Sequence, residues 1–274
     1  MTDASVLTVV QARTGSSRLP GKVLLRAAGK SLLIHQVERI RRARLVGTVL
    51  VATTVLAEDD EIVRLCEGLV PCFRGHPTDL LDRHYWAAHG MGSRHVVKIP
   101  SDCPLIDPNV IDQVLTFYLA APGRFDYVSN LHPQSFPDGN DVEIFSFEAL
   151  QRAWLEARAD FEREHTTPYF WDSRGRFRVG NVLWETGLDY SRSHRWTVDY
   201  PEDYELVREV FGELYPRNPA VGLGDILAFL AARPALAEHN ARHRGVNWYR
   251  HHLSRLKDVI AAETPPSAAT GSSR

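Results

Sequence analysis

The sequence predicts an α/β fold, in which a mainly parallel β-sheet is flanked by helices on both faces. Short runs of β-branched and other apolar residues alternate with longer segments of helical periodicity along the first 130 residues. These runs are continuously apolar, which is typical of strands that are covered on both faces. With 274 residues, of which 44% are hydrophobic and 24% charged, the chain can bury a large core.

The first half carries the clearest alternation. Strands are predicted at Val6–Val10, Val49–Ala52, around Cys72–Phe73, at His95–Ile99 and at Tyr127–Ser129. Helices are predicted between them over Ser31–Ala43, Asp59–Gly68, Asp79–His89 and Pro108–Leu119. The first helix has Leu33, Val37 and Ile40 at helical spacing, and the second has an acidic first turn, which the helix dipole favours. Strands and helices in this order indicate βαβ units with right-handed crossovers.

The second half is less regular. Residues 131–140 contain two prolines and a glycine and read as a loop. Strands are then predicted at Val142–Phe145, Phe177–Leu183 and Arg195–Val198, and helices over Glu148–Arg158, Glu202–Leu214, Asp225–Ala232 and Trp248–Ala261. Because no linker or repeat interrupts the chain, we expect a single domain over residues 1–262, with a smaller subdomain in its second half. Residues 263–274 are rich in small residues and are expected to form a flexible tail.

Composition excludes several classes of protein. There are 32 basic and 34 acidic residues, which give a net charge of −2 and argue against a general nucleic-acid binder. Three cysteines without a C-x-x-C pair do not form a disulfide framework or a zinc knuckle, and they fit the reduced thiols of a cytoplasmic protein. The N-terminus lacks the basic region of a signal peptide, and no apolar run reaches 18 residues, so neither secretion nor a membrane partner is expected.

The loop after the first strand carries a concentration of charge. Residues 11–22 lie at the carboxyl end of a strand, where open α/β sheets bind ligands. They contain three cations and two glycines, namely Arg13, Arg18, Lys22, Gly15 and Gly21. Only four of the 32 basic residues are lysines, so a lysine inside a motif is less expected to be random surface charge. The composition favours a polyphosphate-binding loop, and an exposed basic loop is the alternative.

Two familiar phosphate motifs do not fit this loop. Five residues separate its glycines and Val23 follows Lys22, whereas a Walker A loop has four residues there and a Ser or Thr after the lysine. The dinucleotide fingerprint G-x-G-x-x-G is also absent.

The loop and four later blocks resemble one family. The chain is similar to the cytidylyltransferases that make CMP-activated acid sugars, and most closely to the family called spore coat polysaccharide biosynthesis protein F. This family is homologous to the 3-deoxy-manno-octulosonate (KDO) and acylneuraminate cytidylyltransferases. The later blocks are residues 98–107 (KIPSDCPLID), 137–146 (PDGNDVEIFS), 163–169 (REHTTPY) and 197–203 (TVDYPED). The five blocks occur in order and cover roughly residues 5–210.

The resemblance implies a nucleotide-diphospho-sugar-transferase-like (Rossmann-like) fold with a small dimerisation and acceptor subdomain. The implied reaction transfers CMP from CTP to an acid sugar, such as a 3-deoxy-ulosonate or nonulosonate, and releases pyrophosphate for surface polysaccharide or glycoconjugate biosynthesis. Residues 1–130 would then bind the nucleotide and residues 131–262 the acceptor. A phosphorylated or phosphonate acceptor, or a non-catalytic nucleotide-binding homologue, is the alternative. A glycosyltransferase is disfavoured because the chain contains no Asp-x-Asp.

The resemblance also implies site residues in the first half. Arg13, Ser16, Arg18 and Lys22 would hold the triphosphate, with Gly15 allowing a tight turn and Ala12 beside it. Asp102 and Asp199 map onto metal-binding aspartates, and Mg²⁺ is the cation expected to neutralise the triphosphate. Arg13, Arg18, Lys22 and Asp102 would be catalytic. For each aspartate the alternative is a helix cap.

Other residues are assigned by position. Gly75 and Thr78 correspond to a turn against the cytosine, with a plain turn as the alternative. Polar residues that could bind the acceptor are Asp138, Asn140, Asp141, Glu143, Arg163, His165 and Arg195. A structural role is favoured over general-base catalysis for His165, and buried packing over nucleophilic chemistry for Cys103.

A homodimer is expected, because aromatic residues beyond position 140 exceed what one sheet layer obviously needs and because related synthetases are dimers. The residues concerned are Phe161, Tyr169, Phe170 and Trp171, and a second core within the chain is the alternative.

Overall fold

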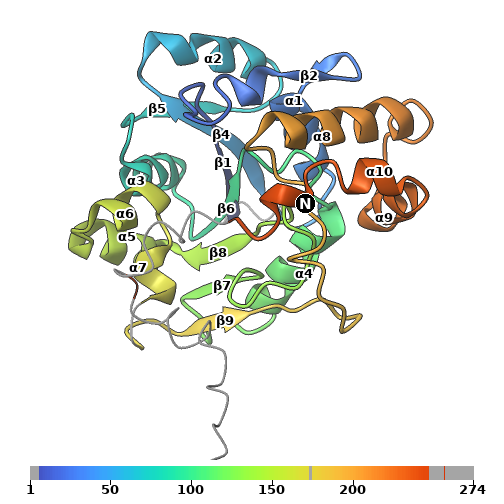
Figure 1. The fold of residues 1–274 in the computed structure, drawn as a ribbon. Helices are drawn as coiled ribbons and strands as arrows, with labels where there is room; N and C mark the ends of the chain where they lie inside the picture. Colours follow the sequence, from blue (N-terminus) through green and yellow to red (C-terminus); the bar gives the residue numbers. More distant parts are fainter. Residues whose placement is uncertain (1–5, 173–174, 247–255, 257–274) are drawn as a thin grey trace, which may run out of the picture.

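Seven strands form one sheet in the computed structural model, which describes residues 6–172, 175–246 and 256 (Figure 1). Their order is β5-β4-β1-β6-β8-β7-β9. The bounds are β1 Val6–Gln11, β4 Thr48–Thr54, β5 Cys72–Gly75, β6 His95–Pro100, β7 Tyr127–Ser129, β8 Glu143–Ser146 and β9 Val179–Asn181. Strands β5, β4, β1 and β6 run parallel, whereas β8 is antiparallel to both β6 and β7. The predicted α/β fold with a mainly parallel sheet is confirmed.

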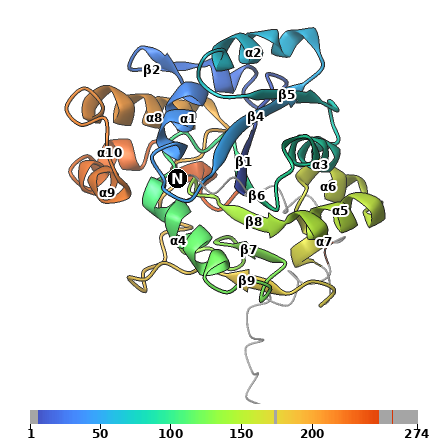
Figure 2. The same ribbon diagram turned by 180° about the vertical axis from the view of Figure 1, so that it is seen from behind.

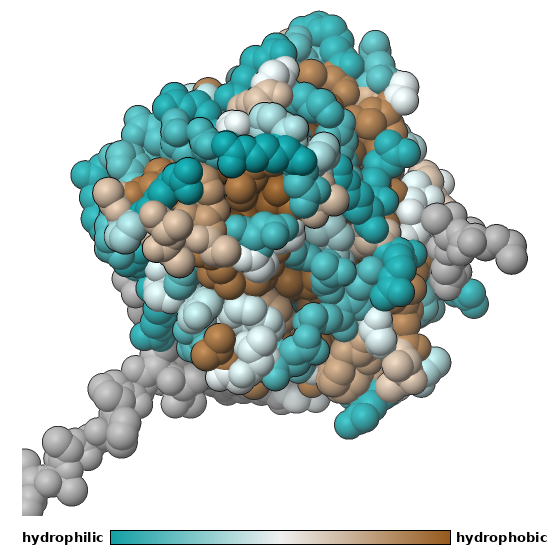
Figure 3. All heavy atoms as spheres, turned by 90° about the vertical axis from the view of Figure 1, so that its right-hand side faces the viewer, coloured by the Kyte–Doolittle hydropathy of each residue, from teal (hydrophilic) through white to brown (hydrophobic). Residues whose placement is uncertain are grey.

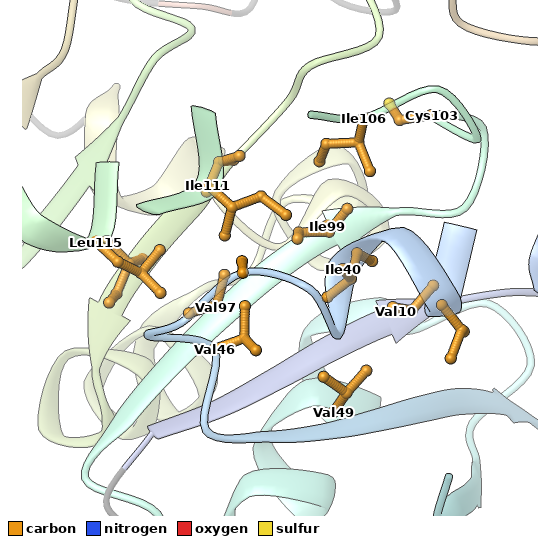
Figure 4. Close-up of a cluster of buried hydrophobic side chains, with 14 of the residues drawn as sticks. Val10, Ile40, Val46, Val49, Val97, Ile99, Cys103, Ile106, Ile111 and Leu115 are labelled. Carbon is orange, nitrogen blue, oxygen red and sulfur yellow. The ribbon is translucent and has the colours of Figure 1, made fainter. Parts of the chain in front are cut away.

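Helices cover both faces of the sheet (Figures 1 and 2). On one face lie α1 (Leu32–Ile40), α2 (Asp60–Cys66) and α4 (Pro108–Leu119). Their side chains pack with those of β1, β4 and β6 in the cluster drawn in Figure 4. On the other face lie α3 (Leu80–Met91), α5 (Phe147–Glu156), α6 (Asp160–His165) and α7 (Pro168–Trp171). Val6 and Val10 of β1 face the first core and Leu7 and Val9 face the second, which explains why this strand is apolar on both faces.

A third group of helices lies beside α1. It consists of α8 (Pro201–Leu214), α9 (Leu223–Ala231) and α10 (Pro234–Ala237), which share a core with Leu32 of α1 and with Trp196. Short elements complete the fold: the hairpin strands β2 (Arg26–Ala27) and β3 (Lys30–Ser31) and the 3₁₀ turns η1 (Lys22–Leu24), η2 (Ala57–Asp59) and η3 (Ala241–His243). The face in Figure 3 is mostly hydrophilic, with hydrophobic patches between polar residues. Among the helices in the described parts of the chain, none is long and apolar enough to span a membrane.

Strands from both predicted halves join the same sheet, since β8 and β9 come from the second half. The predicted strand at Arg195–Val198 is wrong: only Arg195 pairs, in an isolated bridge with Asp138. The backbone there divides its hydrogen bonds, because Trp196 N–H donates to Asp138 and Val198 N–H donates to Asp102. The helix predicted over Trp248–Ala261 lies outside the described residues apart from Leu256, and the tail 263–274 lies wholly outside them.

The aromatic residues that suggested a dimer lie in the second core of the chain. Phe161, Tyr169, Phe170 and Trp171 are all buried, and Phe170 stacks on Tyr127 and Phe145. Their number is therefore explained by packing within one chain. It no longer supports the predicted homodimer.

Candidate functional site

A cleft of about 400 Å³ opens where β1 and β6 end. This size is in the range of small-molecule sites, which are usually 300–1,000 Å³. The cleft is lined by Gln11 of β1, by Pro100 of β6 and by the cations of residues 11–22, which we call the phosphate loop. Residues from the second half of the chain complete the lining. The predicted site residues that the cleft brings together are Arg13, Gly15, Ser16, Arg18, Lys22, Asp102, Asp138, Asp141, Glu143, His165, Arg195 and Asp199.

The phosphate loop is anchored by its backbone. Ala12 is fully buried and its N–H donates to Ala52 of β4, so Ala12 continues the sheet and does not line the cleft. Thr14 binds the Asp59 carboxylate through both its N–H and its hydroxyl, at 2.7 Å each. The chain then reverses at Gly21, whose φ of 68° is favourable for glycine and strained for other residues. At Gly15, where the resemblance implies a tight turn, the Ser16 N–H donates to the Thr14 carbonyl at 2.8 Å, and Gly21 is the residue of the loop with a left-handed backbone.

Lys22 is the centre of the loop's charge. Its ammonium donates to Asp102 Oδ2 at 3.3 Å, to Asp199 Oδ1 at 2.9 Å and to the Val198 carbonyl at 2.8 Å. Burial alone would lower the pKa of Lys22, but the carboxylates of Asp102 and Asp199 raise it. The side chain is only 12% exposed, so this lysine is not surface charge on an exposed loop.

The helix-cap alternatives for the two aspartates are excluded by the local structure. No helix begins near Asp102, since α4 begins at Pro108 and is capped by Asp107. At α8 the capping carboxylate is Asp203, which accepts from the N–H groups of Asp199 and Tyr200. Asp102 and Asp199 lie close together because their two segments are hydrogen-bonded: the Val198 N–H donates to the Asp102 carbonyl at 2.7 Å.

Asp199 lies among three cations. Besides Lys22, its carboxylate contacts Arg18 at 2.6 Å and Arg195 at 3.2 Å. Burial would raise the pKa of Asp199, but Lys22 and Arg18 outweigh it and hold that pKa well below its usual value. Asp199 is therefore a stable anion at one wall of the cleft, and Asp102 faces it across Lys22.

Arg195 joins Asp199 to the segment that contains Asp138. Its guanidinium binds Asp138 at 3.0 Å, Asp203 at 3.0 and 3.1 Å and Asp199 at 3.2 Å. Gly139 makes the approach possible, because its φ is 108° and a Cβ there would lie 2.7 Å from Thr197 N. Burial and the neighbouring Asp141 raise the pKa of Asp138 well above its usual value. Burial and Asp102 likewise raise the pKa of Asp141 to about 7.

Some predicted residues lie away from the cleft. Asn140 is buried and holds the loop together by accepting from Asp107 N–H and donating to the Pro137 carbonyl. Thr78 and Arg163 line a neighbouring hollow that shares Arg13 with the cleft. There Arg163 pairs with Asp79, the residue that caps α3. Gly75 lines neither space and packs against Phe73 and Arg83.

Sequence reasoning missed several residues that line the cleft, and Lys98 is the foremost. It lies directly across from Glu143 in the β6–β8 register, and the two side chains form an ion pair. Lysine is rare in the chain, and Lys98 lies in the block at residues 98–107 that resembles the family, so this signal could have identified it. His132, Gln134, Thr167 and Trp171 come from loops and a short helix and carried no such signal. Cys103 is fully buried in the core beside Ile106 (Figure 4), which confirms packing as its role.

Comparison with known proteins agrees with this geometry. The cytidylyltransferase family model matches residues 7–221. An uncharacterised protein of Methanocaldococcus jannaschii is 34% identical over 87% of this chain and 96% of its own length. Spore coat polysaccharide biosynthesis protein SpsF of Bacillus subtilis is 26% identical over 85% and 96%. A 3-deoxy-manno-octulosonate cytidylyltransferase of Trichlorobacter lovleyi is 35% identical over a shorter stretch, 43% of this chain and 46% of its own.

Among solved structures, a cytidylyltransferase from Leptospira borgpetersenii superposes with a TM-score of 0.80 and 30% identity, covering 85% of this chain and 96% of that one. The matched segment contains the phosphate loop and both aspartates. The chain belongs to the cytidylyltransferase family of CTP-dependent nucleotidyltransferases.

Proposed function

We propose that the protein transfers CMP from CTP to an acid sugar and releases pyrophosphate, in the synthesis of a surface polysaccharide or other glycoconjugate. The observation that carries the proposal is the convergence of Arg18, Lys22, Asp102 and Asp199 at one end of the cleft. These cations suit a triphosphate, and the other polar residues that line the cleft would bind a sugar.

The phosphate loop would bind the nucleotide. Arg18 and Lys22 present charged donors at the carboxyl end of β1, where phosphate oxygens would replace part of their contact with Asp199. Arg13 and Ser16 line the same end, so both can reach the triphosphate. We place the base toward the hollow that contains Thr78, because Arg13 connects that hollow to the cleft.

The donor set fits a hard divalent cation. Two carboxylates converge on a single positive centre, the ammonium of Lys22, and carboxylate oxygen is the ligand that Mg²⁺ prefers. Within the described residues, no group of three or more His, Cys, Asp or Glu gathers for a metal, so phosphate oxygens would complete the shell. Asp102 and Asp199 would hold the ion. When bound, it would neutralise charge on the triphosphate and on the departing pyrophosphate.

In the reaction that follows, an acceptor hydroxyl oxygen bonds to the α-phosphorus while the bond to the pyrophosphate oxygen breaks. The hydroxyl proton passes to solvent. Arg18 and Lys22 would stabilise the negative charge that accumulates on the pyrophosphate. The far end, with Asp138, Asp141 and His165, would hold the acceptor.

Two further parts of the proposal do not depend on the reaction chemistry. We propose that the protein forms a homodimer, on the basis of the family resemblance alone. We also propose that it acts in the cytoplasm, where its substrate CTP is present. A phosphorylated or phosphonate acceptor is the second candidate, because the resemblance covers such branches and the acceptor segment near Asp138 is where they would differ.

The test measures pyrophosphate release from each of the four nucleoside triphosphates with Mg²⁺, in the presence of a panel of acid sugars and phosphorylated sugars. The proposal predicts release with CTP and at least one acid sugar. Tighter binding of ATP or GTP than CTP in calorimetry would contradict the nucleotide assignment. Release only with a phosphorylated acceptor would favour the second candidate.

A further inference from the structure

Two cations that line the cleft, Arg195 and Lys98, differ in the number of hydrogen-bond acceptors around them. Arg195 is 1% exposed, and each of its five N–H groups has an acceptor. Nε binds Asp203, Nη1 binds Asp138 and the Val246 carbonyl, and Nη2 binds Asp199 and Asp203. Arg195 therefore has no donor left for a ligand, although the sequence suggested it as one that could hold an acceptor carboxylate.

Arg163, the other arginine suggested for that role, points elsewhere. It donates to Asp79 at 2.6 Å and to the Trp154 carbonyl at 2.8 Å, and it lines the neighbouring hollow. Arg195 therefore cannot hold an acceptor carboxylate without breaking a built contact, and Arg163 does not line the cleft.

Lys98 has the opposite character. It lines the cleft from β6, is 13% exposed, and donates to Glu143 across the strand pair. An ammonium has three donors, and within the described part of the chain Glu143 is the acceptor found for Lys98. An ammonium that lines a cleft and has donors to spare can bind an anionic group there, because a charge-assisted hydrogen bond is among the stronger polar contacts.

Glu143 does not cancel the charge of Lys98 alone. It is 1% exposed and also accepts from the Tyr127 hydroxyl at 2.7 Å and from Thr167. Burial would raise the pKa of Glu143, but Lys98 outweighs it, so the carboxylate stays ionised. Three donors thus share one carboxylate, and the pair with Glu143 holds Lys98 at the wall of the cleft.

We propose that Lys98 is the residue that binds the acceptor's carboxylate and thereby selects sugar acids over neutral sugars. This inference rests on the proposed function, and it names the residue that recognises the carboxylate of the acid-sugar acceptor. Arg13, Arg18 and Lys22 lie at the phosphate-loop end, where the triphosphate would occupy them.

The test compares Lys98→Met with Lys30→Met, a matched control. Lys30 also pairs with a glutamate, Glu38 at 2.6 Å, but on the surface and outside the cleft. Pyrophosphate release is measured with CTP and a panel of 3-deoxy-ulosonic, nonulosonic and aldonic acids, together with a neutral sugar and a sugar phosphate. CTP binding without acceptor is measured by calorimetry.

Wild-type enzyme is expected to use a carboxylate-bearing acceptor. Lys98→Met should raise the KM for that acceptor roughly ten- to hundredfold, the loss of one charge-assisted hydrogen bond, with CTP affinity unchanged within about threefold. Lys98→Arg should recover part of the affinity. Because Lys98→Met leaves Glu143 buried without its cation, the double variant Lys98→Met with Glu143→Gln, which removes both charges, is measured beside it.

If the acceptor KM is unchanged in Lys98→Met and in the double variant with Glu143→Gln, the inference is overturned and the proposed function remains intact. Preference of the wild-type enzyme for the neutral sugar or the sugar phosphate would also overturn it. Failure of the wild-type enzyme to bind CTP would instead overturn the proposed function, and the inference with it.

Discussion

Replacing Asp102 by Asn tests whether this residue binds metal or only stabilises the fold. Its carboxylate contacts Lys22 at 3.3 Å and is 27% exposed, so the ion pair contributes about 1 kcal/mol or less to stability. Lys22 keeps Asp199 and the Val198 carbonyl as partners in the variant. For a chain of this size, we therefore expect the melting temperature to fall by no more than about 2–4 °C.

Turnover should respond very differently. Asn has lost the full negative charge that a hard divalent cation prefers, and such a cation supplies several kcal/mol of transition-state stabilisation. We expect turnover to fall at least about a hundredfold, equivalent to about 2.7 kcal/mol, and to recover partly when Mg²⁺ is raised. The assay is pyrophosphate release over a Mg²⁺ series, with a thermal melt of the same sample.

Asp112→Asn is the matched control for this variant. Asp112 is buried outside the cleft and accepts from the N–H groups of Arg44 and Leu45. Its replacement should cost about 1–3 kcal/mol of stability and leave turnover unchanged. Unchanged turnover in Asp102→Asn would refute the metal assignment, and a loss of stability as large as that of the control would show a structural role.

Three other predictions concern the phosphate-loop cations, Asp141 and the oligomeric state. Arg18→Ala and Lys22→Ala should each lower kcat/KM roughly ten- to hundredfold with the fold intact, whereas Lys30→Ala should not; wild-type kinetics in either would exclude a role in phosphate binding. The pKa of Asp141 is raised to about 7 in the folded protein, whereas in the unfolded chain it is about 4. The free energy of unfolding should therefore decrease as the pH rises from about 4 to 7. Asp141→Asn should therefore melt higher than wild type at pH 8 and equally below pH 4, and equal melting at both would contradict this. Light scattering at micromolar concentration should give the mass of a dimer, and a single peak at the mass of one chain would remove the homodimer.

The sheet could be predicted because its signals are local. Val6–Val10 and His95–Ile99 are continuous apolar runs, and the helices between them have clear periodicity and start signals such as Pro108. The segment Arg195–Val198 has the same apolar and β-branched composition, but its partners are Asp138 and Asp102, which lie on two different segments. Composition alone cannot distinguish a strand from an extended segment whose hydrogen bonds are divided in this way.

The site could be predicted where a motif fixes the backbone. Arg18, Lys22, Asp102 and Asp199 meet as the family blocks imply, through contacts that join residues 80 to 181 positions apart. The acceptor end was less predictable, because each side chain there has several available partners. The donors of Arg195 are all taken by three aspartates and the Val246 carbonyl, while Lys98 lines the cleft with donors to spare. Only the tertiary structure shows this difference.

The most direct test of the central claim is the phosphorus NMR spectrum of the product formed from CTP, Mg²⁺ and the best acid-sugar acceptor. CMP transfer predicts one new signal, from the phosphodiester that joins CMP to the sugar, together with an equal amount of pyrophosphate. A spectrum showing only unchanged CTP with every acceptor, or CMP and pyrophosphate without a sugar phosphodiester, would contradict the account.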